Sequence, residues 1–361
     1  MSVFQEAFYV KIRRILSIAA ALAAILSAFG CSGTNNSEVS EEVVINTGID
    51  PHSIIFDWQK PYEEKLKEFS SSSAYSSKNS RFDLYDIDLD GTPELIISPD
   101  IEHSSVCEVY TYRNALEKVT DIGANGTFRY IPSLNCIGYE YSGEGFVYGE
   151  FHSVSENPSE PVITFYNNLG SAAGGVTINY EVNNEEVTLA EYESTVQVYS
   201  GAAAVDLGRK YTFGEKSIDY ALHCSQSWGA VLSDIQKNAY KKILSDIIAN
   251  SPENDAAFEI ADLDGNNVPE LILSTGFTDI CDCHVYFLNE AVVNDLGTSC
   301  GQYGCFTFDV ENSVFFSDGK AETQCWSLND ADLDKFKPSE NTMVCGRSYI
   351  LTNDSVNFAF R

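Results

Sequence analysis

The stretch "FDLYDIDLDGTPELIIS", residues 82–98, decides how this part of the chain folds. Its acidic side chains stand at alternate positions, and an apolar run follows them directly. They are Asp86, Asp88, Asp90 and Glu94. Two carboxylates about 5 Å apart repel each other by roughly 3 kcal/mol at an effective dielectric constant near 20. The pattern therefore predicts a bound cation among the four side chains, because without one they must splay apart or take up protons.

The stretch occurs a second time as "FEIADLDGNNVPELILS", which begins at Phe258. The offset from Phe82 is 258 − 82 = 176 residues, and it holds without a gap across seventeen positions, of which eight are identical. The same offset relates "CEVY" at Cys107 to "CHVY" at Cys283. A repeat of this length predicts that the chain consists of two copies of one structural unit.

Each copy is expected to form an α+β domain with a helix at its start and an antiparallel sheet. The octets "YEEKLKEF" (Tyr62–Phe69) and "YKKILSDI" (Tyr240–Ile247) place apolar residues at helical spacing. Runs rich in β-branched and aromatic residues, such as "VCEVYTY", "PVITFY" and "SVFFS", predict strands after each acidic loop. Two copies are too few for a β-propeller. We therefore expect two repeat domains, at residues 51–212 and 213–361.

Both acidic loops place oxygen-bearing side chains at positions 1, 3, 5 and 9, counted from the first Asp. Position 7 is Thr or Val and would contribute a backbone carbonyl. The candidate ligands are Asp86, Asp88, Asp90, Thr92 and Glu94 in loop 86–94, and Asp262, Asp264, Asn266, Val268 and Glu270 in loop 262–270. Six to eight hard oxygens at about 2.3–2.6 Å suit calcium. Position 6 must turn sharply, and its residues Gly91 and Asn267 are those best able to adopt a positive φ.

These loops resemble the calcium loops of FG-GAP and VCBS-type repeats and of surface lipoproteins of Firmicutes, which carry a DxDxDGxxE pattern. The resemblance implies calcium binding through the oxygens named above. A true EF-hand has Glu at position 12, where this chain has Ile97 and Leu273, so we expect an EF-hand-like loop between strands. Two alternatives are a solvated acidic hairpin without metal, and magnesium, which prefers fewer protein ligands in stricter octahedra.

The N-terminus indicates export. Basic residues precede the apolar run "ILSIAAALAAILSAF" (Ile15–Phe29), which is too short for a transmembrane helix, and "GCSG" follows. This arrangement resembles a bacterial lipoprotein signal, which implies cleavage just before Cys31 and lipidation of that residue. Ala28 stands where such signals usually have Leu, and an ordinary secretory signal cut nearby is the alternative. We assign residues 1–31 to a signal peptide with lipidated Cys31.

Two further assignments concern the segments beside this signal. "VKIRRILS" has the form of a natural start, so Val10 is predicted to be the true initiator, read from a non-standard codon. Residues 32–50 are polar and acidic with little hydrophobic periodicity, and we interpret them as a tether that holds the folded part off the membrane.

Composition limits the class of partner. The chain has 53 acidic and 22 basic residues in 361, a formal net charge of −31. Nucleic-acid binding needs a basic footprint, so this balance argues against it. A hydrophobic content of 44% is enough for packed cores, and the acidic excess suits a cation-rich medium outside the cell.

The cysteines allow three interpretations. Cys281, Cys283, Cys300 and Cys305 form a candidate zinc site, although one residue between the first two is fewer than usual. Disulfides are favoured over zinc in an exported protein. Cys107 and Cys283, at matching positions of the repeat, are alternatively small buried hydrophobic residues.

No nucleophile or zinc-protease signature occurs in the chain. We therefore expect a calcium-binding protein, lipid-anchored at the outer face of a bacterial cell membrane, with a non-catalytic role in binding, adhesion or sensing. Its partner would be a surface ligand, protein or glycan. The rival hypothesis is a secreted hydrolase acting on glycan or cell wall, in which calcium is structural.

Overall fold

The computed structural model describes residues 55–360 except for a set of short segments. These are 103–104, 144, 155–159, 169–178, 203, 224–231, 251–255, 265, 267, 277–282, 290–291, 301–304, 319–322 and 328–335. The predicted signal peptide, Cys31 and the tether at 32–50 lie outside the described residues. Within the described part of the chain, no helix is long and apolar enough to cross a bilayer.

The chain folds into two compact units. The N-terminal unit comprises residues 55–223 and 338–344, and the C-terminal unit comprises the described parts of 224–337 and 345–360. The first unit therefore extends beyond the predicted boundary after residue 212 and includes helix α4 (Glu215–His223). The reason is a contact between helices: the Gln59 side-chain amide in α2 (Gln59–Ser70) donates to the Leu222 carbonyl at 2.8 Å.

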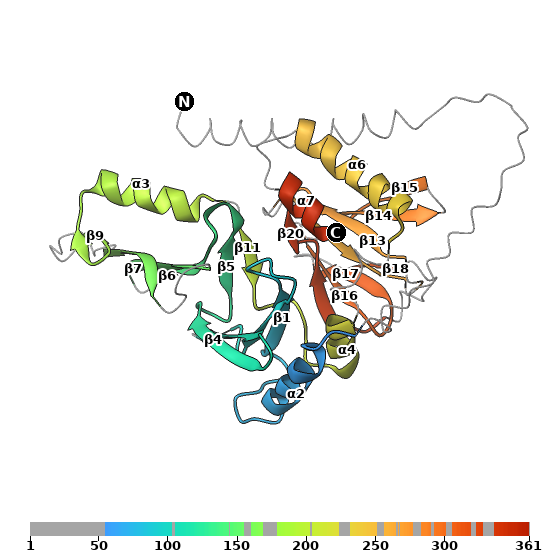
Figure 1. The fold of residues 1–361 in the computed structure, drawn as a ribbon, viewed down its shortest axis with the longest axis horizontal. Coiled ribbons are helices and arrows are strands. Elements are labelled where there is room, and N and C mark those ends of the chain that lie inside the picture. Colours follow the sequence, from blue (N-terminus) through green and yellow to red (C-terminus); the bar gives the residue numbers. More distant parts are fainter. Residues whose placement is uncertain are drawn as a thin grey trace, which may run out of the picture. The chain divides into compact units, whose positions relative to one another are not determined.

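The N-terminal unit begins with a four-stranded antiparallel sheet in the order β1-β2-β3-β4, beside which α2 lies (Figure 1). Its strands are β1 (Arg81–Tyr85), β2 (Glu94–Ser98), β3 (Cys107–Tyr112) and β4 (Leu116–Ile122). All five residues of β2 are buried, because this strand lies inside the sheet under the helix. The predicted helix and the strand–loop–strand hairpin are both confirmed.

A seven-stranded antiparallel sheet follows in the same unit, in the order β10-β9-β8-β7-β6-β5-β11. Its elements are β5 (Phe128–Ile131), the 3-10 turn η2 (Pro132–Leu134), β6 (Cys136–Gly143), β7 (Phe146–Ser153), β8 (Pro161–Asn168), β9 (Tyr180–Val182), β10 (Glu185–Glu186) and β11 (Val205–Leu207). Helix α3 (Leu189–Ser200) begins at a capping box, in which Thr188 and Glu191 bond to each other's backbone N–H groups.

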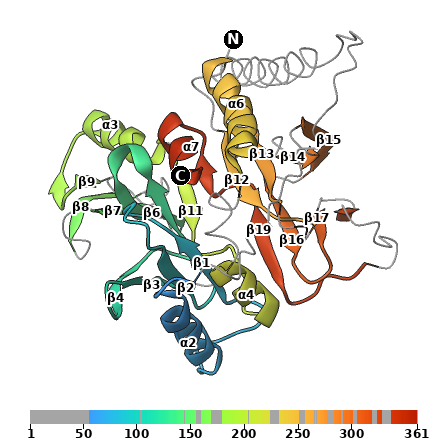
Figure 2. The same ribbon diagram turned by 45° about the vertical axis from the view of Figure 1, so that its right-hand side comes forward.

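The C-terminal unit contains a five-stranded antiparallel sheet in the order β15-β14-β13-β12-β20. Its strands are β12 (Ala257–Ala261), β13 (Glu270–Ser274), β14 (Cys283–Asn289), β15 (Val292–Cys300) and β20 (Tyr349–Ile350). Helix α6 (Asp234–Asn250) runs along this sheet in both views (Figure 1 and Figure 2). The other elements of this unit are β16 (Phe306–Asp309), β17 (Val314–Asp318), β18 (Thr323–Ser327) and α7 (Asn353–Ala359). Strand β19 (Thr342–Cys345) belongs, except for its last residue, to the segment 338–344 of the N-terminal unit.

The architecture is thus α+β with several antiparallel sheets, as the sequence predicts. The structure also contains elements that the sequence did not indicate, namely α4, α7 and the edge strands β11 and β20. These short elements matter for the core. Phe82 of β1 stacks on Tyr211 at 5.2 Å, just after β11, and Phe258 of β12 stacks on Tyr349 of β20 at 5.1 Å.

Removing the Phe82 ring should unfold the N-terminal unit more easily. Phe82 is fully buried and also contacts Phe213 at 5.2 Å. We expect Phe82→Ala to lower the free energy of unfolding by about 3–5 kcal/mol, since the truncation leaves a cavity between aromatic rings. Urea unfolding followed by circular dichroism measures this change. The control Lys60→Ala, on an exposed side chain, should change stability by less than about 0.5 kcal/mol. A loss below about 1 kcal/mol for Phe82→Ala would contradict the assigned packing.

Candidate metal centre

Each acidic loop connects two neighbouring antiparallel strands. Strands β1 and β2 pair from Arg81↔Ser98 to Tyr85↔Glu94, and strands β12 and β13 pair from Ala257↔Ser274 to Ala261↔Glu270. The final Glu of each loop is therefore also the first residue of the returning strand. Both ends of the loop are held by the ladder, so its ligand positions are brought together by strand pairing.

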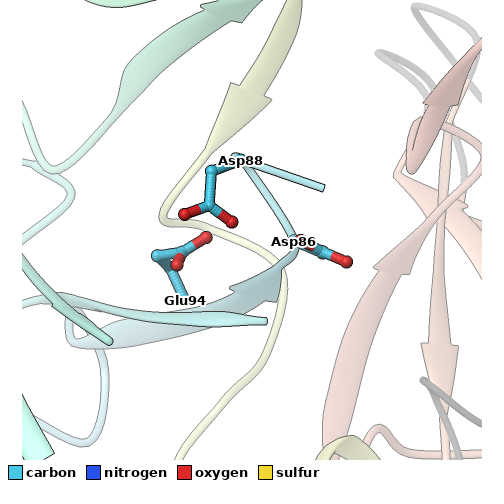
Figure 3. A group of neighbouring side chains, drawn as sticks. All are labelled: Asp86, Asp88 and Glu94. Carbon is cyan, nitrogen blue, oxygen red and sulfur yellow. The ribbon is translucent and has the colours of Figure 1, made fainter. Parts of the chain in front are cut away.

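Three carboxylates gather in each loop. One oxygen from each of Asp86, Asp88 and Glu94 lies within 4.8 Å of the others, and the same holds for Asp262, Asp264 and Glu270. In Figure 3 the carboxylates of Asp88 and Glu94 face each other, whereas that of Asp86 turns toward the other side of the loop. The first Asp and the Glu are buried in both loops, so the groups are partly shielded from water.

The glutamates make the same backbone contact in both loops. The backbone N–H of Ile87 donates to Glu94 Oε2 at 2.8 Å, and that of Leu263 donates to Glu270 Oε2 at 2.7 Å. Thr111 Oγ of β3 donates to the other oxygen of Glu94 at 3.1 Å. Each Glu thus connects the second residue of its loop to the returning strand by a hydrogen bond. Its carboxylate lies beside those of the two aspartates.

The other loop carboxylates accept local backbone N–H groups. Gly91 N–H donates to Asp86 Oδ2 at 2.9 Å, and Thr92 N–H donates to Asp90 Oδ1 at 2.7 Å. Gly91 has a φ of 98°, as predicted for position 6, and Leu89 also has a positive φ of 61°. A bulky residue rarely adopts that region, so the loop holds Leu89 in a conformation that its own preferences disfavour.

The second loop is closed in a similar way. Asn266 N–H donates to Asp264 Oδ1 at 3.0 Å and to Asp262 Oδ1 at 3.2 Å. The Asn266 side chain then accepts from Val268 N–H at 2.6 Å. Position 6 of this loop, Asn267, lies outside the described residues.

A tyrosine of α2 and a tyrosine of α6 each hold the loop of their unit by a hydrogen bond. Tyr62 OH donates to the Pro93 carbonyl at 2.7 Å, and Tyr240 OH donates to the Pro269 carbonyl at 2.9 Å. Both tyrosines are fully buried. Burial, and then the carboxylate of Glu94 or Glu270, raises the pKa of each phenol. The hydroxyl therefore stays protonated and acts as a donor that anchors the residue before the ligand Glu.

The acidic groups are electrostatically costly without a cation. Burial is the main cause that raises the pKa of Glu94 to about 8, and Asp88 and Asp86 add to it. The pKa of Glu270 is likewise raised well above its ordinary value, by burial first and then by its neighbours Asp264 and Asp262. Both shifts have the cause expected when carboxylates are removed from water and placed beside like charges.

The structure thus brings together only some of the ten predicted ligand residues. Three in each loop come together, whereas Asp90 lies at the exposed edge and is not part of the compact carboxylate group. Thr92 and Val268 occupy the expected position in the loop, and Asn266 bonds to Asp264 through its side-chain amide at 2.7 Å. These oxygens are hard donors suited to a divalent cation, so each loop could hold a metal ion.

Sequence reasoning missed several residues around these loops. Arg113 lies 3.5 Å from Asp88, but 61% of its side chain is exposed, so this ion pair is weak. A second missed feature supports the strand before each loop. Gly208 N–H donates to Asp83 at 3.2 Å, and Gly346 N–H donates to Glu259 at 2.8 Å.

The signal for this feature is present in the sequence as "GRKY" at Gly208 and "GRSY" at Gly346. Its offset is 346 − 208 = 138, not 176, which explains why a search at a constant offset does not find it. Past the motif, "SIDYA" at Ser217 and "SVNFA" at Ser355 keep the new offset, 355 − 217 = 138. These segments lie in α4 and α7.

The structure tests part of the three interpretations of the cysteines. Cys107 and Cys283 are fully buried at matching strand positions, as expected for small hydrophobic residues. Cys107 and Cys136 form no disulfide, so the general expectation of disulfides does not apply to these two residues, which are both buried in a sheet. The candidate zinc site cannot be assembled from described residues, because Cys281 lies outside them.

Comparison with known proteins identifies no relative. No protein-family model, curated protein or solved structure matches the chain.

The raised pKa of Glu94 predicts an unusual pH dependence in chelator. The unfolded chain loses this proton near pH 4.5, whereas the folded chain keeps it until about pH 8. The folded state therefore binds more protons between these values, and the free energy of unfolding must fall as pH rises from 5 to 8. Glu94→Gln should remove part of that fall, measured by urea unfolding at each pH.

The control is Glu117→Gln, an exposed residue of β4, which should keep the wild-type slope. Calcium should also flatten the slope of the wild type, because it favours the ionised carboxylate. An identical slope for wild type and Glu94→Gln in chelator would show that Glu94 is ionised throughout this range.

Proposed function

We propose that the chain binds two calcium ions, one in each acidic loop. The observation that carries this proposal is the pair of Asp/Asp/Glu groups, each with ligand atoms within 4.8 Å and each placed between paired strands. Carboxylate oxygens are hard ligands, which exclude soft metals as the preferred occupant. Calcium is favoured over magnesium because the loop supplies many protein oxygens in a flexible arrangement.

The proposed role of calcium is structural. The cation would remove the repulsion that raises the pKa of Glu94 and Glu270, and it would fix each loop between its two strands. With millimolar calcium and a dissociation constant of about 0.1 mM, each site adds on the order of 1.4 kcal/mol to stability. Such affinities are typical of extracellular modules, which meet calcium at this concentration.

We further propose that the two units are copies of one ancestral domain. The equivalences include the Tyr–Pro hydrogen bonds beneath the loops, the Glu–backbone bonds within them, the Gly–carboxylate bonds and the Phe–Tyr stacks. Independent origins would have no reason to repeat four contacts in the same order. The copies differ in length: 208 − 94 = 114 residues separate the ligand Glu from the Gly-Arg motif in the first, and 346 − 270 = 76 in the second.

At the level of the cell, the proposal is a protein anchored by lipid at the extracellular face of the cell membrane, with a non-catalytic binding, adhesion or sensing role. The supports are the lipoprotein-like signal that ends at Cys31, the acidic tether after it, and the net charge of −31. Calcium would make the hairpin of each unit rigid and so fix the adjoining surface in one conformation for a ligand.

Calcium titration by calorimetry in a metal-free buffer should give two ions per chain. Asp86→Ala and Asp262→Ala should each leave one, because each removes the first ligand of one loop. Asp121→Ala is the matched control: this residue lies in strand β4, is half exposed and is outside both loops. A stoichiometry of zero, or a loss of both ions in either variant, would contradict two independent sites.

Lipid anchoring is tested separately. Cys31→Ser should move the chain from the membrane fraction to the medium of a Gram-positive bacterial host, because serine cannot form the thioether to the lipid. Cys136→Ser, at a thiol buried in β6, should stay in the membrane fraction. Equal membrane association of both variants would mean that another segment anchors the chain.

A further inference from the structure

The seven-stranded sheet has two faces of different character. On one, Phe151 and Phe165 pack against Tyr199 and Tyr192 of α3, with ring centroids 5.0 and 6.1 Å apart. All four belong to a buried or partly buried apolar cluster. Figure 1 shows α3 lying along this side of β6 to β9. This face is the core of the layer.

The opposite face carries a continuous group of aromatic rings, which we call the aromatic face. It consists of Tyr139, Tyr141, Phe146, Tyr148 and Tyr166 from strands β6, β7 and β8, all of which are half-buried. Strand pairing places Tyr141 opposite Tyr148 and Tyr148 opposite Tyr166, so the rings are direct neighbours. Ring centroids lie 5.5 Å apart for Tyr141–Phe146 and 5.9 Å for Phe146–Tyr166.

A fixed carboxylate borders these rings. Glu150 accepts a hydrogen bond from Tyr148 OH at 2.5 Å and lies 2.6 Å from His152 Nε2. His152 is only 5% exposed, and its other ring nitrogen, Nδ1, is buried and has no hydrogen-bond partner. Glu181 of β9 pairs with Tyr166 and so belongs to the same face. Glu186 of β10 pairs with Glu181 and lies on this face as well. Among the described residues of these strands, the ionisable side chains beside the rings are therefore three glutamates and one buried histidine.

The segment that carries the aromatic face is strongly acidic. Residues 130–208, which build β6 to β11 and α3, contain eleven acidic residues and no Lys or Arg. The rest of the chain has 22 basic residues in 361 − 79 = 282 positions, so their absence here is not a general property of the protein. This segment contributes a charge of −11 to the net −31 and contains no Lys or Arg that could neutralise an anion. Arg129 of β5, just before it, donates to the carbonyls of Ser200 and Ala202.

The aromatic face lies between the loop glutamate Glu94 and the Gly-Arg motif at Gly208. The interval between the ligand Glu and the Gly-Arg motif is longer by 114 − 76 = 38 residues in the first copy. The aromatic face also borders the loop 86–94. The ring of Tyr130 in β5 packs against that of Tyr85 with centroids 5.7 Å apart, and burial and then the carboxylates of Asp86 and Asp88 raise the pKa of Tyr130. Calcium in loop 86–94 would therefore fix one end of this face.

We propose that the aromatic face binds a basic peptide segment of a partner protein, through Lys or Arg side chains laid over the tyrosine rings. This inference deepens the binding role proposed above, because it names the surface and the chemistry of the ligand. The electron-rich faces of the rings attract ammonium and guanidinium groups, and the glutamates supply the opposite charge. The negative charge of this segment would repel an anionic ligand, and a neutral glycan would gain no electrostatic attraction from it.

The test is binding of the full chain, in calcium, to a fluorescent ten-residue peptide of alternating Lys and Gly, followed by anisotropy. A Glu-Gly peptide of the same length and a neutral oligosaccharide of six glucose units serve as comparison probes. The Lys-Gly peptide should bind saturably. The double variant Tyr148→Ala with Tyr166→Ala should weaken binding by about tenfold, because it removes two cation–π contacts and leaves the charge unchanged.

Two controls separate this effect from misfolding and from general attraction to an acidic protein. Replacing the same two tyrosines by Phe keeps the rings and should keep the affinity within about twofold. Tyr112→Ala, on the other sheet of the unit, should behave as wild type. Equal affinity of wild type and the double Ala variant, or binding of the oligosaccharide alone, would overturn the proposal. Calcium titration of the double variant shows independently whether the metal loops still work.

Discussion

The hydrogen bond from the second loop residue to the buried glutamate is the constraint on which each unit depends. Through it, Glu94 closes the turn between β1 and β2, and Glu270 closes the turn between β12 and β13. The same glutamate is grouped with two aspartates, and the proline before it accepts a hydrogen bond from a tyrosine of α2 or α6. One side chain thus connects helix, hairpin and metal loop, and its charge state affects all three.

This arrangement has a cost that a cation would remove. A buried carboxylate beside other carboxylates favours its protonated form, and the raised pKa of both glutamates expresses that cost. With calcium bound as we propose, the same groups would become ligands, and the feature that destabilises the metal-free hairpin would stabilise the calcium-bound one. The fold of the hairpin and the proposed function of the protein therefore have one physical origin.

Much of this could be predicted from the sequence because the determining residues are close together in the chain. Alternating Asp at 86 and 88, Gly91 at the turn and the apolar run after Glu94 are all local signals, and each has the predicted place. The contacts that were not predicted join distant segments: Tyr62 to Pro93, Asp83 to Gly208, and α2 to α4. A constant offset of 176 does not relate these segments, since the interval from the loop Glu to the Gly-Arg motif is 38 residues longer in the N-terminal unit than in the C-terminal unit.

The most direct test of the account is thermal unfolding of the full chain with chelator, with millimolar magnesium and with millimolar calcium. The account predicts that calcium raises the unfolding midpoint, that magnesium raises it much less, and that Asp86→Ala and Asp262→Ala each lose part of the calcium effect. An unfolding midpoint that is the same in calcium and in chelator would mean that the two loops are acidic hairpins without a metal, and the central claim would be wrong.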